Sequence, residues 1–264
     1  MNEEATAAAT RKPVDPSSTR AAGGTVEIEA SPEQVWRALT DAIELERWFP
    51  LEARVEPGPN GSLWMSWKNE YAGASEILVW DLPRHLQTSW GWSEGGPPQM
   101  TDYLLEGRGG RTVLRVVTSG FPLDASWDEW VEGTRLGWRY ELASLKHYLE
   151  RHAGEDRTVI YLRRRVPLTP EDAWARVFDS AGFGERPLGG QSFDHDPPRQ
   201  YAAIVEEPRD AMLRISMEPC YGDNDARDVT LWLSAWGEAG RALPDIEKDW
   251  ARRLVRLFPE GMNP

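Results

Sequence analysis

The pattern of apolar and polar positions changes its period several times in the first half of the chain. In Thr25–Ala30, apolar residues alternate with glutamates, which predicts a short strand. Ser31 then marks a helix start, because serine is a good N-cap, the proline after it suits the first helical position, and Gln34 completes a capping box. A second short helix is expected over residues 41–49, since a proline follows.

Between residues 51 and 119 the apolar positions recur with a period of two, as in strands. Turn signals rich in glycine and proline separate the alternating runs, at 57–61, 81–83, 95–98 and 107–110. Short connections of this kind join antiparallel neighbours, so six strands in a meander are expected after the two helices.

A long helix is predicted at about residues 126–152, where apolar residues recur every three, four or seven positions and form one stripe. Its interior contains Gly133 and Gly137, and each glycine costs about 1 kcal/mol relative to alanine. Two explanations stay open: a close approach or spare room at that face, or a kink or loose first turn.

The second half of the chain repeats the ends of the first. The pattern from Ser31 to Asp41 returns from Thr169 to Asp179, an offset of 138 residues. Trp138, Leu142 and Leu145 return at an offset of 112 as Trp250, Leu254 and Leu257. The second copy is therefore 26 residues shorter, which corresponds to about two missing strands. We predict a disordered tail (1–23), a first domain (24–154) and a shortened second domain (157–264), whose trimmed sheet could pack on the first domain.

Several motifs in a fixed order carry a resemblance to a known fold. They are Ser31-Pro32-Glu33 with Trp36, Leu39 and Asp41; Trp48-Phe49; Asp81-Leu82-Pro83 with His85, Ser89 and Trp90; Thr112 with Leu114; Ser119-Gly120-Phe121; and Gly137-Trp138 with Leu142 and Leu145. Over residues 24–152 the chain resembles the START-like, helix-grip superfamily called SRPBCC, and within it the homologues of the heat-shock-protein-90 ATPase activator. The resemblance implies an α+β fold in which a curved antiparallel sheet wraps around a long C-terminal helix, with a cavity between them.

Composition and charge narrow the classes of partner. The net charge of −13 argues against nucleic acid, which is bound by clustered lysines and arginines. The basic run 163–165 is interpreted as outward-facing, solvated charge on a strand. A single cysteine, Cys220, allows no intrachain disulfide and fits a cytoplasmic protein. The N-terminal tail lacks the apolar core of a secretory signal, and no segment is apolar enough to be inserted in a membrane.

Motifs for catalysis, cofactors and metals are not recognised. The chain has no phosphate-binding glycine loop and no Gly-x-Ser-x-Gly elbow, so no cofactor and no catalytic residue is assigned. No metal site is assigned either: His147 and His152 are five positions apart on a helix, and residues 194–196 are interpreted as a solvated loop.

Arg115 is the charged residue of greatest interest in the predicted sheet. It shares strand parity with Val113 and Val117, so it could point into the cavity and hold an anionic oxygen. The alternative is that Leu114 and Val116 fill the core and Arg115 faces solvent. Glu76 and Glu132 are considered as its partners, or as bases with a raised pKa.

Tryptophan is unusually frequent, with 14 residues, ten of them before residue 139. Aromatic side chains suit both thick cores and ligand cavities. The predicted ligand-binding residues are Trp48, Phe49, Trp67, Trp90, Tyr103, Arg115 and Trp138.

Three hypotheses of function follow. The first is the binding of a hydrophobic or amphipathic small molecule without catalysis, in the cavity between sheet and helix. The second is an enzyme resembling polyketide cyclases or dehydratases, with Arg115 as electrophile and an acidic residue or His85 as base. The third is a protein-interaction or co-chaperone module. The oligomeric state is left open.

Overall fold

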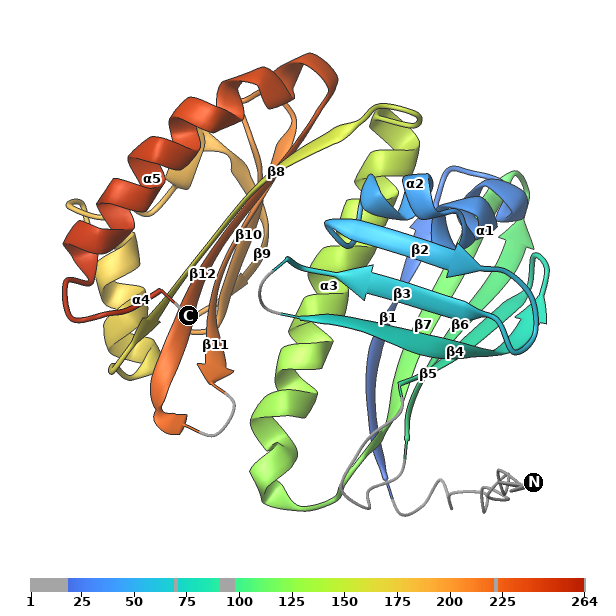
Figure 1. Ribbon diagram of the computed structural model, residues 1–264. Coiled ribbons are helices and arrows are strands. Elements are labelled where there is room, and N and C mark those ends of the chain that lie inside the picture. Colours follow the sequence, from blue (N-terminus) through green and yellow to red (C-terminus); the bar gives the residue numbers. More distant parts are fainter. Residues whose placement is uncertain (1–18, 69–70, 91–97, 221–222, 264) are drawn as a thin grey trace, which may run out of the picture.

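The computed structural model describes residues 19–68, 71–90, 98–220 and 223–263, and its first half has the predicted order of elements (Figure 1). These elements are β1 Arg20–Ile28, α1 Pro32–Thr40, α2 Ala42–Glu46, β2 Glu52–Glu56, β3 Ser62–Ser66, β4 Ala72–Asp81, β5 His85–Trp90, β6 Gln99–Arg108, β7 Arg111–Phe121 and α3 Asp128–Arg151. The strands form one antiparallel sheet in the order β1-β7-β6-β5-β4-β3-β2. Together they give the predicted α+β fold.

The capping box of α1 is confirmed. The backbone N–H of Gln34 donates to Ser31 Oγ over 3.3 Å, and the backbone N–H of Ser31 donates to Gln34 Oε1 over 2.8 Å. The first strand begins earlier than predicted, at Arg20, because residues 20–24 pair with β7. The predicted tail 1–23 is therefore wrong for residues 20–23, while its first 18 residues lie outside the described part of the chain.

The second half repeats this topology with two strands fewer, as predicted. Its elements are β8 Arg157–Val166, α4 Pro170–Phe178, β9 Gln191–Asp196, β10 Gln200–Val205, β11 Ala211–Cys220, β12 Asp223–Trp236 and α5 Leu243–Leu257. The sheet order β8-β12-β11-β10-β9 pairs the first strand with the last, as in the first sheet. Thr169 caps α4 as Ser31 caps α1. None of the described helices is both long and apolar enough to cross a membrane.

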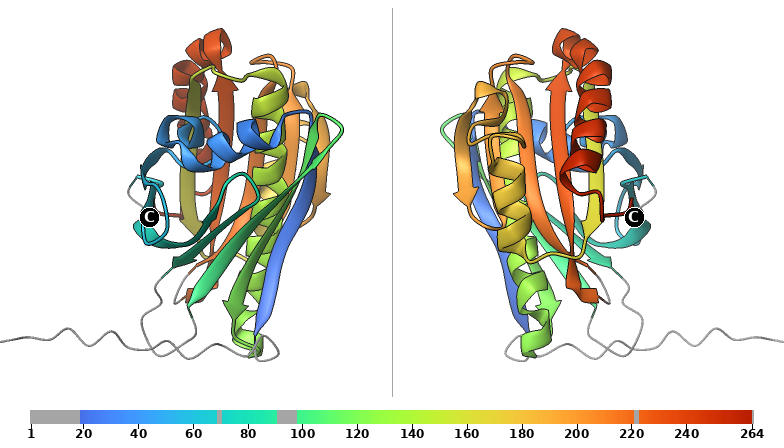
Figure 2. Two further views of the ribbon diagram at one scale, coloured as in Figure 1. Left: turned by 90° about the vertical axis from the view of Figure 1, so that its right-hand side faces the viewer. Right: turned by 90° about the vertical axis from the view of Figure 1, so that its left-hand side faces the viewer.

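Helix α3 lies between the two sheets, while α4 and α5 cover the far face of the second sheet (Figure 1). In the side views of Figure 2, α3 runs alongside the strands of the second sheet. Met212, Trp232 and Trp236 of that sheet belong to the same apolar core as Trp138 and Leu145 of α3. The second sheet is thus packed on the first domain.

A network of buried polar groups joins α3 to the second sheet. Gln200 is fully buried, and its Nε2 donates to the carbonyl oxygen of Leu136 over 3.1 Å and to Asp194 Oδ2 over 2.7 Å. Arg214 Nε donates to Gln200 Oε1 over 2.8 Å, and Arg139 forms an ion pair with Asp194. Residues 194–196, predicted as a solvated loop, therefore lie in β9, and Asp194 is buried because Arg139 and Gln200 satisfy its carboxylate.

The basic run 163–165 is paired and only partly solvated, contrary to the prediction of free, solvated charge. Arg163 and Arg165 both bind Asp228, which has no exposed surface, and the two bonds from Arg165 are 3.0 Å long. Arg164 points to the other face, where its Nε donates to the carbonyl oxygen of Phe258 over 2.7 Å. A buried acid and a backbone carbonyl thus bind these three arginines, and Arg164 is itself buried.

Replacing Gln200 with leucine is expected to lower the free energy of unfolding by about 2 kcal/mol, because the Leu136 carbonyl and Arg214 Nε lose a buried partner. Urea denaturation measures the change. Gln191→Leu, on an exposed position of β9, is the control and should change stability by less than about 0.5 kcal/mol. Equal effects of the two substitutions would contradict the role of the network.

Replacing Asp228 with asparagine is expected to cost about 3 kcal/mol at pH 7, since Arg163 and Arg165 lose their buried counter-charge. Burial alone would raise the pKa of Asp228, but the hydrogen bonds and charges of Arg165 and Arg163 outweigh it and hold the pKa below the ordinary 3.8. The difference in stability between the two proteins should therefore be complete at neutral pH and shrink as the pH falls below about 4. Denaturation curves at several pH values test this, and a difference that grows in acid would contradict it.

Candidate functional site

Five of the predicted ligand-binding aromatic residues form one cluster between the first sheet and α3. The Phe49 ring centroid lies 5.0 Å from that of Trp48, 5.4 Å from Trp67 and 5.7 Å from Trp138. Tyr103 meets Trp138 edge-on at 5.9 Å. These rings pack on one another, so each contributes to the core of the first domain, and their role in ligand binding stays a prediction.

The cluster continues towards the surface through Tyr71, which sequence reasoning missed. The Tyr71 ring lies 6.3 Å from Trp67 and 5.6 Å from Trp90, the sixth predicted aromatic residue. Tyr71 is 48% exposed and lines a cleft on the side of the second sheet. An aromatic path therefore leads from the core of the first domain to this cleft.

Arg115 does not point into the domain interior. Leu114 and Val116 are buried, and Arg115 is exposed on the opposite face of β7. The prediction that Arg115 lines a cavity is wrong. Side chains alternate between the two faces of a strand, and here the face that carries Leu114 and Val116 packs in the core. His85 also lies away from the core, where its Nε2 is 2.7 Å from Asp102 Oδ1.

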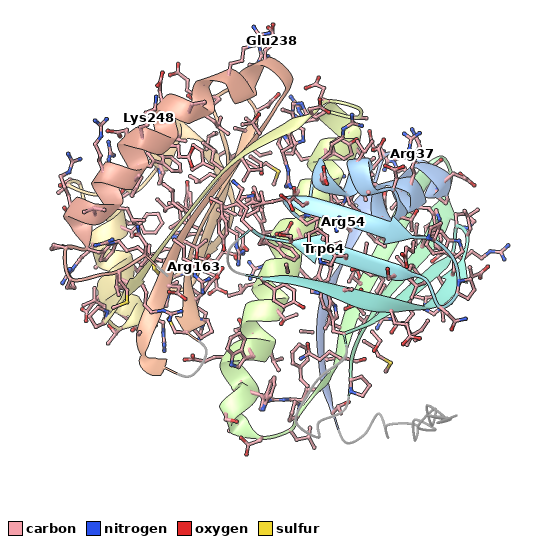
Figure 3. The ribbon with its side chains drawn as sticks, viewed as in Figure 1. Arg37, Arg54, Trp64, Arg163, Glu238 and Lys248 are labelled. Carbon is pink, nitrogen blue, oxygen red and sulfur yellow. The ribbon has the colours of Figure 1, made fainter. Side chains whose placement is uncertain are left out.

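The outer face of the first sheet carries polar and charged side chains. Arg54 and Trp64 lie there together, with the guanidinium carbon 4.5 Å from the ring centroid (Figure 3). Arg115 and His85 share this side of the sheet, so neither can meet a ligand held between the sheet and α3.

The cleft has a volume of about 1420 Å³ and runs along the N-terminal half of α3. Residues of α3, Tyr71 just before β4, and residues of β8, β11 and β12 line it. Arg163, which Figure 3 labels on the second sheet, is one of the basic residues of its wall. The basic lining residues are Arg20, Arg163, Arg165, Arg199, Arg214 and Arg227. The acidic ones are Asp128, Glu129, Glu132, Glu171 and Glu218. The wall thus offers charged groups of both signs next to apolar surface.

Gly133 and Gly137 lie on the α3 wall of this cleft. A Cβ atom added at either position would meet no atom within 4 Å. The structure therefore selects spare room over close approach for these two glycines, and α3 continues through both as one helix.

The acidic groups near the cleft differ in protonation. Arg135 hydrogen-bonds Glu132 and thereby lowers its pKa, so the prediction of a raised pKa for Glu132 is wrong. Glu141, one helical turn beyond Gly137, has the opposite shift. Burial raises the pKa of Glu141 to about 8, although the charges of Arg214 and Arg157 oppose this. Its spacing of four and eight from the two glycines is the sequence signal that could have singled it out.

The comparisons with known proteins bear on the first domain. Residues 29–150 match the family model described as Activator of Hsp90 ATPase homolog 1-like protein. No curated protein matches the chain.

Several solved structures are similar to the chain at low identity. Protein MLL2253 from Mesorhizobium loti is 23% identical, with a TM-score of 0.44 over 50% of this chain and 98% of its own. The Aha1 dimer from Colwellia psychrerythraea is 18% identical, with a TM-score of 0.43 over 51% and 99%. DynU16 of the dynemicin biosynthetic locus is 19% identical, with a TM-score of 0.45 over 81% and 86%.

The family match covers six of the seven strands of the first sheet, β2 to β7, and α3 up to residue 150. The second unit repeats the strand order of the first sheet in shortened form. Residues 29–150 of this chain are therefore an Activator of Hsp90 ATPase homolog 1-like domain.

Proposed function

We propose that the protein binds an amphipathic small molecule in the cleft along α3 and catalyses no reaction on it. The observation that carries this proposal is the pair Gly133 and Gly137, which face open space in the wall of the cleft. Glycine in a helix interior costs about 1 kcal/mol relative to alanine, and here no packing neighbour requires it. Room for a ligand is a reason for both glycines.

The lining of the cleft agrees with an amphipathic ligand. Pockets for small molecules combine apolar walls with a few polar groups that fix orientation. Tyr71 and Trp130 supply aromatic surface, while Arg163, Arg165 and Arg214 supply hydrogen-bond donors. The sequence hypothesis put the ligand between α3 and the first sheet, and the proposed site is the flank of the same helix next to the second sheet.

The enzymatic alternative loses its assigned residues, since Arg115 and His85 lie on the outer face of the first sheet. The interaction and co-chaperone alternative stays a prediction.

Native mass spectrometry of the purified protein, followed by solvent extraction, separates the possibilities. A reproducible added mass that is released as a small amphipathic compound is the expected result. No added mass, together with no binding of an apolar dye, would contradict the proposal.

Gly137→Leu is expected to abolish binding of the neutral dye Nile red, because the leucine side chain fills the open space above the helix. The same variant should be more stable than the native protein by about 0.8 kcal/mol, since leucine is a better helix former. Dye fluorescence and urea denaturation measure the two effects. Gly137→Ala is the matched control: it brings a similar gain in helix stability but leaves most of the space, so binding should persist. Equal dye binding by all three proteins would contradict the site.

A further inference from the structure

Strand β11 presents three polar side chains to the cleft. Arg214, Ser216 and Glu218 are two positions apart, so they share one face of the strand, and all three line the cleft. Ile215, on the opposite face, belongs to the separate core of the second unit. The guanidinium carbon of Arg214 lies 5.8 Å from the ring centroid of Tyr140 on α3. The three polar side chains therefore lie on the floor of the cleft, on the face of the second sheet that is turned towards α3.

This floor already binds a carboxylate, which comes from the protein itself. Ser216 Oγ donates to Glu218 Oε1 over 2.9 Å, and the same carboxylate oxygen lies 3.3 Å from Arg214 Nη2. Ser216 is 2% exposed, whereas the side chain of Glu218 is 32% exposed. A buried hydroxyl and an arginine thus form a carboxylate-binding position whose present occupant is partly open to solvent.

Arg214 is held in place independently of Glu218. Its Nε donates to Gln200 Oε1 over 2.8 Å, and Gln200 is fully buried. Gln200 also lies directly opposite Ser216 in the register of β10 and β11. Departure of the Glu218 side chain would therefore leave both donors in position. The rigid fork of donors on a guanidinium is well suited to the two oxygens of another carboxylate.

A second buried hydroxyl lies next to this position. Thr230 of β12 is directly opposite Ser216, which places their Cβ atoms about 5 Å apart on the same face of the sheet. Thr230 is 2% exposed, and its Oγ1 has no hydrogen-bond partner among the described residues. A buried hydroxyl without a partner lowers stability, because it has lost its hydrogen bonds to water. A carboxylate that accepts from both Ser216 and Thr230 would remove this cost.

We propose that the ligand of the cleft is an organic acid whose carboxylate replaces that of Glu218 and binds to Arg214, Ser216 and Thr230. This inference rests on the proposed function and adds the chemical class of the ligand. Because the Glu218 side chain is partly exposed, it can turn into the solvent when the ligand enters. The exchange keeps the charge of Arg214 paired and gives Thr230 a partner. Glu218 is then an internal competitor of the ligand.

Two fluorescent probes that differ in a single group test the carboxylate site. They are dansylaminoundecanoic acid, which is ionised at neutral pH, and its uncharged methyl ester. Fluorescence titration gives the dissociation constant of each probe, and the ratio of the two affinities isolates the contribution of the carboxylate. Glu218→Gln should raise the preference for the acid about tenfold, because the competing charge is removed from Arg214 and Ser216.

Thr230→Val should lower the preference for the acid about fivefold relative to the native protein, because the ligand loses one hydrogen bond. The same substitution should not lower the urea midpoint, since the hydroxyl has no partner in the described structure. Thr112→Val is the matched control for stability. Thr112 is also fully buried on a strand, but its Oγ1 donates to the carbonyl oxygen of Ala30 over 2.7 Å. Its replacement should lower the midpoint and leave the preference for the acid unchanged.

Glu132→Gln is the matched control for charge. Glu132 lines the same cleft, but it belongs to α3 and pairs with Arg135, so its replacement removes one negative charge without freeing Arg214. The preference for the acid should stay within about twofold of the native value, because solvent screens a charge at this position.

A preference that Glu218→Gln leaves unchanged, or that Glu132→Gln raises equally, would overturn the inference. A native preference in Thr230→Val would overturn it as well. In each of these cases binding of the ester would leave the proposed function standing. Failure of both probes to bind the native protein would overturn the proposed function and the inference together.

Discussion

The structure depends on a single helix that is buried from two sides. Trp138 and Tyr140 of α3 are two positions apart, which is about 200° around a helix, and each packs on a different sheet. The two sheets contact α3 along its length, but in its N-terminal half they leave the flank of the helix between them uncovered. The cleft is this uncovered flank. Its position follows from how much of a helix two sheets can cover, and no separate element is needed to form it.

The same helix contains features that local rules disfavour. Gly133 and Gly137 weaken it, and Glu141 is a partly buried carboxyl whose pKa is raised by burial. Contacts with both sheets stabilise α3 enough to tolerate these costs. Such conflicts between local preference and fold are typical of functional positions, and all three lie on one line of the helix surface. Gly133 and Gly137 lie in the wall of the cleft, and they are the physical link between the fold and the proposed binding.

Structural features that depend on short stretches of the chain could be predicted from the sequence. The cap at Ser31, the antiparallel meander, the long helix and the two-strand deficit of the second unit depend on local spacing and are observed. Arg115 was placed on the wrong face of its strand because both faces are apolar in sequence: Val113 and Val117 lie on one, and Leu114 and Val116 on the other. Only the packing of α3 shows which of the two faces the core.

Long-range burial was beyond such reasoning. Arg163 and Arg165 are satisfied by Asp228, more than 60 residues away, and a sequence pattern does not contain that pairing. Glu141 stayed unnoticed for a related reason. The pattern places it on a helix, but it does not reveal that a second sheet from the other half of the chain covers the helix. The part of the site contributed by the second sheet therefore needed the structure.

Helix α5 occupies the place in the second unit that α3 occupies in the first, but only one of its faces is covered. Leu243, Trp250 and Leu254 pack on the sheet, while charged residues such as Glu247 and Lys248 point outward (Figure 3). Proteins built from stacked repeats need a polar outer surface on the terminal unit to remain soluble. The exposed charges of α5 give the outer side of the second unit a polar surface of this kind.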